Sequence, residues 1–95
     1  MIPSEKYLLR LYVTGLTSRS TRAIKHVREV CEEHLAGQYD LEVIDVYQEP
    51  DRIAEDQIVA IPTLVKRNPA PVRLMVGDMS NRQRLLSGLG LPDDD

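Results

Sequence analysis

The chain has 95 residues, enough for one hydrophobic core and too few for two domains. Hydrophobic residues make up 42% of the chain and charged residues of both signs 28%, a balance typical of folded globular proteins and not of disordered chains. The formal net charge of −3 argues against a nucleic-acid-binding protein, and no run of residues approaches the roughly 20 apolar positions that a membrane-spanning helix needs.

The N-terminal residues and the cysteine content indicate the cellular compartment of the protein. Residues 1–6 lack the apolar stretch of a secretory signal, and the single cysteine, Cys31, excludes an intramolecular disulfide bond. We therefore expect a cytoplasmic protein. Because the sequence shows no internal repeat or linker, we predict a single domain over residues 1–95, with an acidic tail at about 92–95.

The first half of the chain has the pattern of a strand, a helix and a second strand. Residues 7–13 are nearly continuously apolar, as in a strand covered on both faces, and Arg10 is an exception that could reach the strand end or a partner. Residues 18–35 carry apolar side chains at helical spacing, with Cys31 among them, and residues 41–47 form the second strand. This spacing predicts a right-handed unit with parallel strands.

The second half begins with a short helix at residues 51–57 and continues with two strands. Pro62 marks the entrance of the third strand, at residues 63–67, because proline cannot donate to the middle of a sheet ladder. The fourth strand, at residues 72–76, follows after so short a turn that the pair should form an antiparallel hairpin.

A final helix completes the predicted order βαβαββα of an α/β protein. Ser80 is its expected N-cap, and its apolar face carries three leucines. Gly88 and Gly90 should break the helix, because glycine weakens a helix by about 1 kcal/mol relative to alanine.

This order of elements, with Ile61-Pro62-Thr63 before the third strand, resembles thioredoxin-like domains, in which the bond before that proline is cis. Redox members of that class carry at least one cysteine in the loop that leads into the first helix, where the helix N-terminus activates a thiolate. The corresponding loop here, residues 15–20, contains no sulfur. We interpret the hydroxyl groups of this loop as helix caps: those of Thr17, Ser18 and Ser20.

No other set of residues predicts catalysis or a cofactor. Cys31 is best read as a small core residue, and Cys31 with His34 offers two ligands where a structural zinc ion needs four. The sequence has no glycine-rich phosphate loop and no Ser-His-Asp set. We therefore expect no metal, no cofactor and no enzymatic activity. A diverged redox enzyme with an unconventional nucleophile is the weaker alternative.

Six short motifs lie along residues 7–91 in a fixed order. They are Leu11-Tyr12-Val13-Thr14-Gly15, Arg22-Ala23-Ile24-Lys25, Val43-Ile44-Asp45-Val46, the run from Glu55 to Leu64, Pro69-Ala70-Pro71-Val72-Arg73 and Gly77-Asp78-Met79-Ser80-Asn81-Arg82. Together they resemble the KaiB family of the bacterial circadian clock and separate this chain from an ordinary thioredoxin. The resemblance covers nearly the whole chain.

The resemblance implies a regulator and not a catalyst. KaiB-like proteins bind the N-terminal half of the KaiC ATPase ring, alter its phosphorylation cycle, and compete there with a histidine kinase whose sensor domain resembles them. The resemblance thus implies a KaiC-type ATPase as partner, in a circadian clock or in clock-like timing or stress responses, and no nucleic acid or membrane. The alternative is a thioredoxin-like adaptor or a sensor domain for a histidine kinase.

Carried over residue by residue, the resemblance implies a basic partner-binding surface. It includes Arg22, Lys66 and Arg73, which are basic here as in the clock proteins. Lys25 lies one helical turn beyond Arg22 and joins them. A basic patch of this kind suits an acidic surface on the ATPase ring.

The family also implies two folds: a thioredoxin-like monomer that binds the partner, and a resting homo-oligomer, a dimer or tetramer, with a rearranged C-terminal half. The residues compatible with such a change are Pro62, Pro69, Pro71 and Gly88. X-Pro bonds isomerise over tens of seconds when uncatalysed, and Gly88 weakens the last helix. Gly88→Ala is predicted to shift the population of the two folds, as read by NMR amide spectra and molecular size.

Two departures from the family pattern bear on the partner. Asp40 and Glu42 are acidic where clock relatives carry a neutral and a basic residue, and Gly90 replaces an acidic residue. The first change alters the electrostatics beside the expected interface. It leaves two partners open, a clock KaiC and a diverged KaiC-like ATPase.

Overall fold

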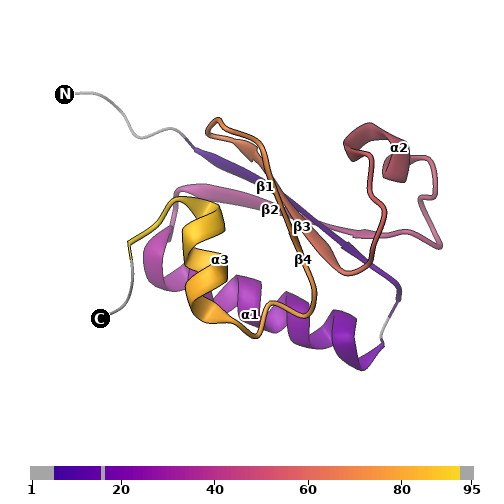
Figure 1. Ribbon diagram of the computed structural model, residues 1–95, viewed down its shortest axis with the longest axis horizontal. Helices are drawn as coiled ribbons and strands as arrows, with labels where there is room; N and C mark the ends of the chain where they lie inside the picture. The colour runs from indigo at the N-terminus through magenta and orange to yellow at the C-terminus, as the bar shows by residue number, and fades with distance from the viewer. Residues whose placement is uncertain (1–5, 16, 93–95) are drawn as a thin grey trace.

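A four-stranded mixed sheet in the order β2-β1-β3-β4 organises the fold, with helices on both of its faces (Figure 1). The computed structural model describes residues 6–15 and 17–92. The elements along the chain are β1 (Tyr7–Val13), α1 (Ser18–His34), β2 (Tyr39–Asp45), α2 (Arg52–Asp56), β3 (Thr63–Asn68), β4 (Arg73–Val76) and α3 (Arg82–Leu89).

The pairing of the strands confirms the predicted topology. β1 pairs in parallel with β2 and antiparallel with β3, and β3 and β4 form the expected antiparallel hairpin. β2 begins and ends two residues earlier than the predicted 41–47, because its register against β1 runs from Tyr7 opposite Tyr39 to Val13 opposite Asp45. The length of the central strand, and not the local apolar pattern, therefore sets the ends of β2.

The larger core lies between the sheet and the two longer helices, α1 and α3. The predicted helix at 18–35 is confirmed, and Cys31 is fully buried on its apolar stripe. Full burial of an aliphatic side chain contributes about 1.5–3 kcal/mol, so this layer dominates the stability of the fold. Its buried members are Leu9, Leu11, Val13, Ala23, Val27, Val30, Cys31, Leu35, Leu64, Met79, Leu85, Leu86 and Leu89.

A smaller core covers part of the opposite face, beneath α2. It consists of Tyr12, Ile44, Val46, Ile58 and Val65. Because α2 is only five residues long, it does not cover the sheet as far as the edge strand β4. The β4 side chains on that face therefore stay exposed.

The start and the end of α3 differ from the sequence prediction. Asn81, and not Ser80, is the N-cap: its side chain accepts a hydrogen bond from the backbone N–H of Arg84 at 3.1 Å. The prediction of Ser80 is wrong because the helix begins at Arg82, so the capping position directly before it is Asn81, while Ser80 lies one residue earlier in the turn. Gly88 does not break the helix, whereas Gly90 ends it as the C-cap at φ 75°, a conformation that glycine adopts without strain.

The Ile61–Pro62 bond is cis, as the resemblance to thioredoxin-like domains implies. The bonds before Pro69 and Pro71 are cis as well. None of the described helices is long and apolar enough to cross a membrane.

Candidate partner-binding site

Arg22 and Lys25 lie on the exposed side of the N-terminal half of α1. Arg22 Nε lies 3.4 Å from Asp78 Oδ2, so the helix is tied to the loop that follows β4. Hydrogen bonding from Ser80, and then the Arg22 guanidinium, lowers the pKa of Asp78. The side chain of Arg22 is still about half exposed, at 52%, and remains accessible to a partner.

Lys66 and Arg73 face each other across the β3–β4 hairpin. Arg73 is exposed, but Lys66 is only 4% exposed, because its stem lies on the sheet face that carries α3. Burial, and then the charge of Arg73, lowers the pKa of Lys66. Lys66 can therefore contribute positive potential to a partner, while Arg73 offers the contact surface.

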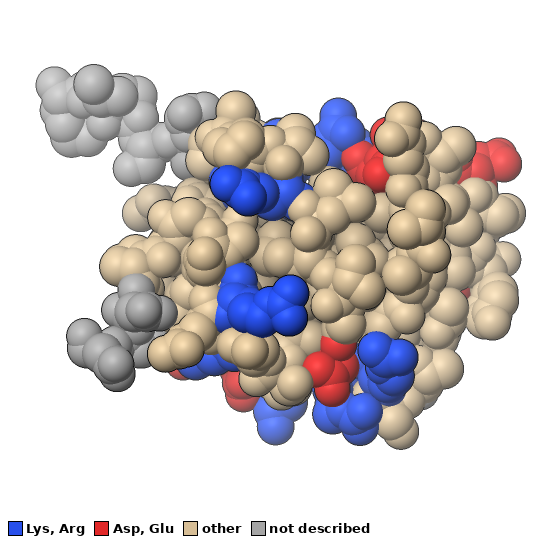
Figure 2. Space-filling view, in the orientation of Figure 1, with Lys and Arg blue, Asp and Glu red and all other residues tan. Residues whose placement is uncertain are grey.

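The four predicted residues do not form one continuous cluster. Arg73 stands at the first residue of β4, and Arg22 reaches Asp78 two residues after its last, so these two arginines border opposite ends of the strand. On the face shown in Figure 2, basic side chains form several separate groups over surface that is mostly uncharged. The structure thus presents two basic ends with an uncharged strand between them.

Of the loop hydroxyl groups predicted to cap α1, that of Thr17 does so, whereas that of Ser20 binds back to Thr14. Thr17 is the N-cap and accepts a hydrogen bond from the N–H of Ser20 at 3.2 Å, while the fully buried Ser20 hydroxyl accepts one from the N–H of Thr14 at 3.1 Å. Burial raises the pKa of the Cys31 thiol to about 12, so its reactive thiolate is scarce at neutral pH. Neither the hydroxyl groups nor the thiol is placed as an activated nucleophile.

A buried charge cluster that no sequence pattern predicts lies on the α2 face, centred on Asp56. The Asp56 carboxylate, 1% exposed, accepts hydrogen bonds from Tyr12 Oη at 2.6 Å, Arg10 Nη1 at 3.0 Å and Arg67 Nη1. Burial raises the pKa of Tyr12 to about 12, assisted by the Asp56 carboxylate. The signal available in the sequence was Arg10, an unpaired charge in an apolar strand. Arg10 was expected to reach the strand end or a partner, but its guanidinium donates to Glu55 and Asp56 of α2.

The acidic residues Asp40 and Glu42 are paired within the chain. Glu42 accepts two hydrogen bonds from Arg52, at 2.8 and 2.9 Å, which lower its pKa. Asp40 lies 3.3 Å from Lys6 Nζ. Their negative charge is thus largely offset locally along β2.

Among the described residues, no group of three or more His, Cys, Asp or Glu side chains is placed to hold a metal ion. The fold and the capped loop define a class: a thioredoxin-like domain without a thiol in the redox position. The chain shares this fold with the N-terminal domain of SasA from Synechococcus elongatus, at a TM-score of 0.73 and 22% identity over all of this chain and 93% of that one. The chain also shares this fold with mitochondrial thioredoxin 3 of Saccharomyces cerevisiae, at a TM-score of 0.72 and 17% identity over 92% of this chain and 79% of that one.

The sequence comparisons identify the family. The KaiB domain model matches residues 10–91, nearly the whole chain. The circadian clock oscillator protein KaiB of Prochlorococcus marinus (strain MIT 9303) is 47% identical over all of this chain and 80% of its own length. The circadian clock protein KaiB3 of Synechocystis sp. is 43% identical over 90% of this chain and 84% of its own length. The chain therefore belongs to the KaiB family of circadian clock proteins.

Proposed function

We propose that this protein is a cytoplasmic, non-catalytic regulator that binds a KaiC-type ATPase and modulates its phosphorylation cycle. Membership of the KaiB family carries the proposal. The structure supports it in two ways. The loop that holds the reactive cysteine in redox relatives is used for helix capping, and exposed arginines stand at both ends of β4.

The binding surface of this proposal consists of Arg22, Lys25, Lys66 and Arg73. A basic surface attracts an acidic partner and raises the association rate, an effect that salt screens over about 8 Å at physiological ionic strength. We therefore expect binding that weakens as salt rises. The buried position of Lys66 predicts that its replacement by a neutral residue affects binding less than replacement of Arg73.

The test is size-exclusion chromatography with light scattering on the protein mixed with a KaiC hexamer from the same source and ATP. We expect the wild-type protein to co-migrate with the hexamer, and Arg22→Glu with Arg73→Glu to weaken binding by tenfold or more. Arg28→Glu is the matched control, because Arg28 is exposed on α1 but lies beside Glu32 and Tyr39. Absence of co-migration at every phosphorylation state of the hexamer would overturn the proposal.

The rate of complex formation tests the expected second fold. Binding that develops over minutes to hours indicates that conversion to the binding fold limits the rate and that this fold is a minor species at rest. A rare competent form also lowers the apparent affinity by its population. Immediate binding indicates that the thioredoxin-like fold already dominates. Light scattering on the protein alone reports whether the resting form is a homo-oligomer.

A further inference from the structure

β4 is an edge strand whose outer hydrogen-bonding groups have no strand beside them in the described sheet. The backbone N–H of Gly77 donates to Pro62 O at 2.9 Å, so this pair is hydrogen-bonded across the hairpin. In an antiparallel pair the bonded positions alternate. Met75 and Arg73 therefore bond to β3, while Leu74 and Val76 direct their N–H and C=O groups away from it, toward the free edge.

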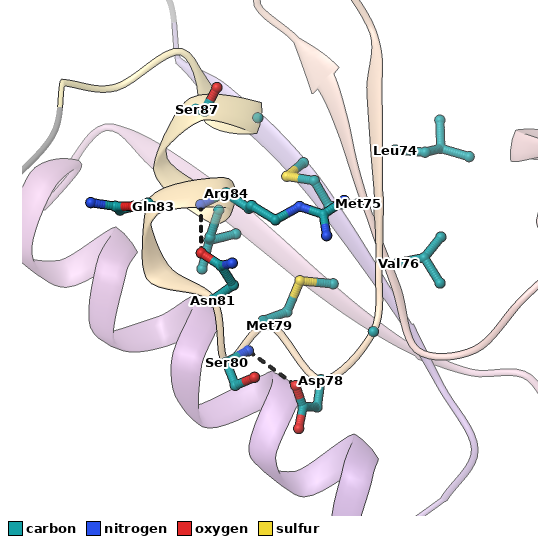
Figure 3. A pocket seen from close by; sticks show the side chains of 13 residues that line it. Leu74, Met75, Val76, Asp78, Met79, Ser80, Asn81, Gln83, Arg84 and Ser87 are labelled. Atoms are coloured by element: carbon teal, nitrogen blue, oxygen red, sulfur yellow. Dashed lines mark hydrogen bonds between the residues drawn. The ribbon is translucent and has the colours of Figure 1, made fainter.

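The side chains along this edge are apolar and exposed. Leu74 is 46% exposed and Val76 61%, and both point away from α3, whereas Met75 points toward it (Figure 3). Exposed edge strands usually carry charges or prolines that block pairing with another chain. Between Arg73 and Gly77, β4 has neither.

A groove of about 800 Å³ runs along the other side of this edge, between β4 and α3. Met75 and Gly88 line it, and the Arg84 side chain extends from α3 across it toward β4 (Figure 3). An extended segment added beside β4 would place alternate side chains in this groove and over Leu74 and Val76.

The charges beside the edge indicate the chemistry of the segment. Neither Arg73 nor Arg84 forms a salt bridge with any residue that the structure describes. Arg73 stands at the start of β4, and Arg84 stands over its middle. Two unpaired guanidinium groups beside an apolar edge favour a segment that alternates apolar residues with carboxylates.

We propose that β4 is a strand-addition site for an extended acidic and apolar segment of the partner protein. Resting on the proposed function, we place this segment in the KaiC-type ATPase. Its backbone pairs with Leu74 and Val76, and its acidic side chains meet Arg84 in the groove and Arg73 at the start of the strand. Continuity with the candidate site supports this position, because Arg22 and Arg73 border the two ends of the same edge.

Hydrogen exchange of individual amides tests the pairing directly. The 15N-labelled protein is exchanged in D2O in complex with the KaiC hexamer, quenched, dissociated and read by NMR. We expect the amides of Leu74 and Val76 to gain at least tenfold protection in the complex, while those of Met75 and Gly77 are slow in both states. Binding without protection at Leu74 and Val76 overturns strand addition but leaves the proposed function standing.

A pair of substitutions at Val76 separates the contribution of its backbone N–H to binding from that of its side chain. Val76→Pro removes an outward N–H without removing a bond to β3, and Val76→Thr keeps that N–H in a β-branched residue. We expect the proline variant to bind the hexamer at least tenfold more weakly and the threonine variant within about threefold of wild type. Equal binding by Val76→Pro overturns the proposal. Concentration-dependent protection of Leu74 and Val76 in the protein alone also overturns it, because a second copy would then occupy the edge.

Discussion

Gly88 of α3 lies directly against Met75 of β4. A Cβ atom at position 88 would stand 2.3 Å from Met75 Sδ and 2.8 Å from its Cγ. The glycine therefore serves close packing of the helix on the edge strand, although the sequence alone suggested only a weak point in the helix.

Gly88→Ala is expected to show two opposing effects. Alanine favours the helix by about 1 kcal/mol, but its methyl group forces Met75 to turn away, at a cost of about 1 kcal/mol for a flexible side chain. The free energy of unfolding should change little in the wild-type background. In a Met75→Ala background the same substitution should stabilise the protein by about 1 kcal/mol, because the obstacle is gone.

Urea unfolding of the wild type, both single variants and the double variant measures this coupling. Additive effects would show that the contact between positions 75 and 88 has no energetic consequence. The contact with Met75 also bears on the predicted effect of Gly88→Ala on the balance between two folds. Any shift should be larger when Met75 is also replaced.

Asp56→Asn should destabilise the protein by about 1–3 kcal/mol, because it weakens charge-assisted hydrogen bonds to three side chains from two strands. The lower part of the range reflects the partial exposure of Arg10 and Arg67. Asp51→Asn is the matched control: Asp51 is exposed and makes no side-chain capping bond. Equal urea midpoints for the two variants would show that the Asp56 cluster contributes nothing.

The same Asp56 carboxylate should make the folded protein less stable in acid. Burial acts to raise the pKa of Asp56, but hydrogen bonds from Tyr12, Arg10 and Arg67 outweigh it, so the pKa lies below its usual 3.8. A carboxylate whose folded pKa is depressed contributes stability at neutral pH, and that contribution is lost as pH falls below about 4. Between pH 6 and pH 3, urea midpoints should fall more steeply for the wild type than for Asp56→Asn. Parallel curves would contradict this.

Cys31 should resist thiol reagents in the folded protein. It is fully buried, and burial raises its pKa to about 12, so both access and thiolate are lacking. We expect reaction with Ellman's reagent at pH 8 to be slow in buffer and complete within minutes in 6 M guanidinium chloride. Rapid labelling in buffer would indicate that α1 opens readily from the sheet. The Cys31→Ser variant gives the background rate.

Much of the fold follows from local patterns in the sequence. The apolar run of β1 and the helical spacing of α1 predict both elements within a residue or two, because each pattern reports which faces are buried. Pro62 and the short turn before β4 predict the hairpin for steric reasons. The ends of β2 are less predictable, because its partner strand sets them.

The four residues of the candidate site were predicted from the family resemblance, and the structure gives them unequal exposure. Arg22 and Arg73 are exposed as expected, but Lys66 is buried, because the alternation of β3 turns it toward the face that carries α3. No periodicity reveals that Asp56 gathers Arg10 and Arg67, which are separated from it by 46 and 11 positions.

The sequence by itself determined the order of elements, the absence of a cysteine from the redox loop and the membership of the KaiB family. These properties depend on local residue patterns and on motifs that each lie in one continuous stretch of the sequence. Only the tertiary structure decided that Gly88 packs on Met75, that Lys66 is buried and that Leu74 and Val76 present a free edge. Those properties arise from the approach of distant segments, whose geometry depends on the register of the whole sheet.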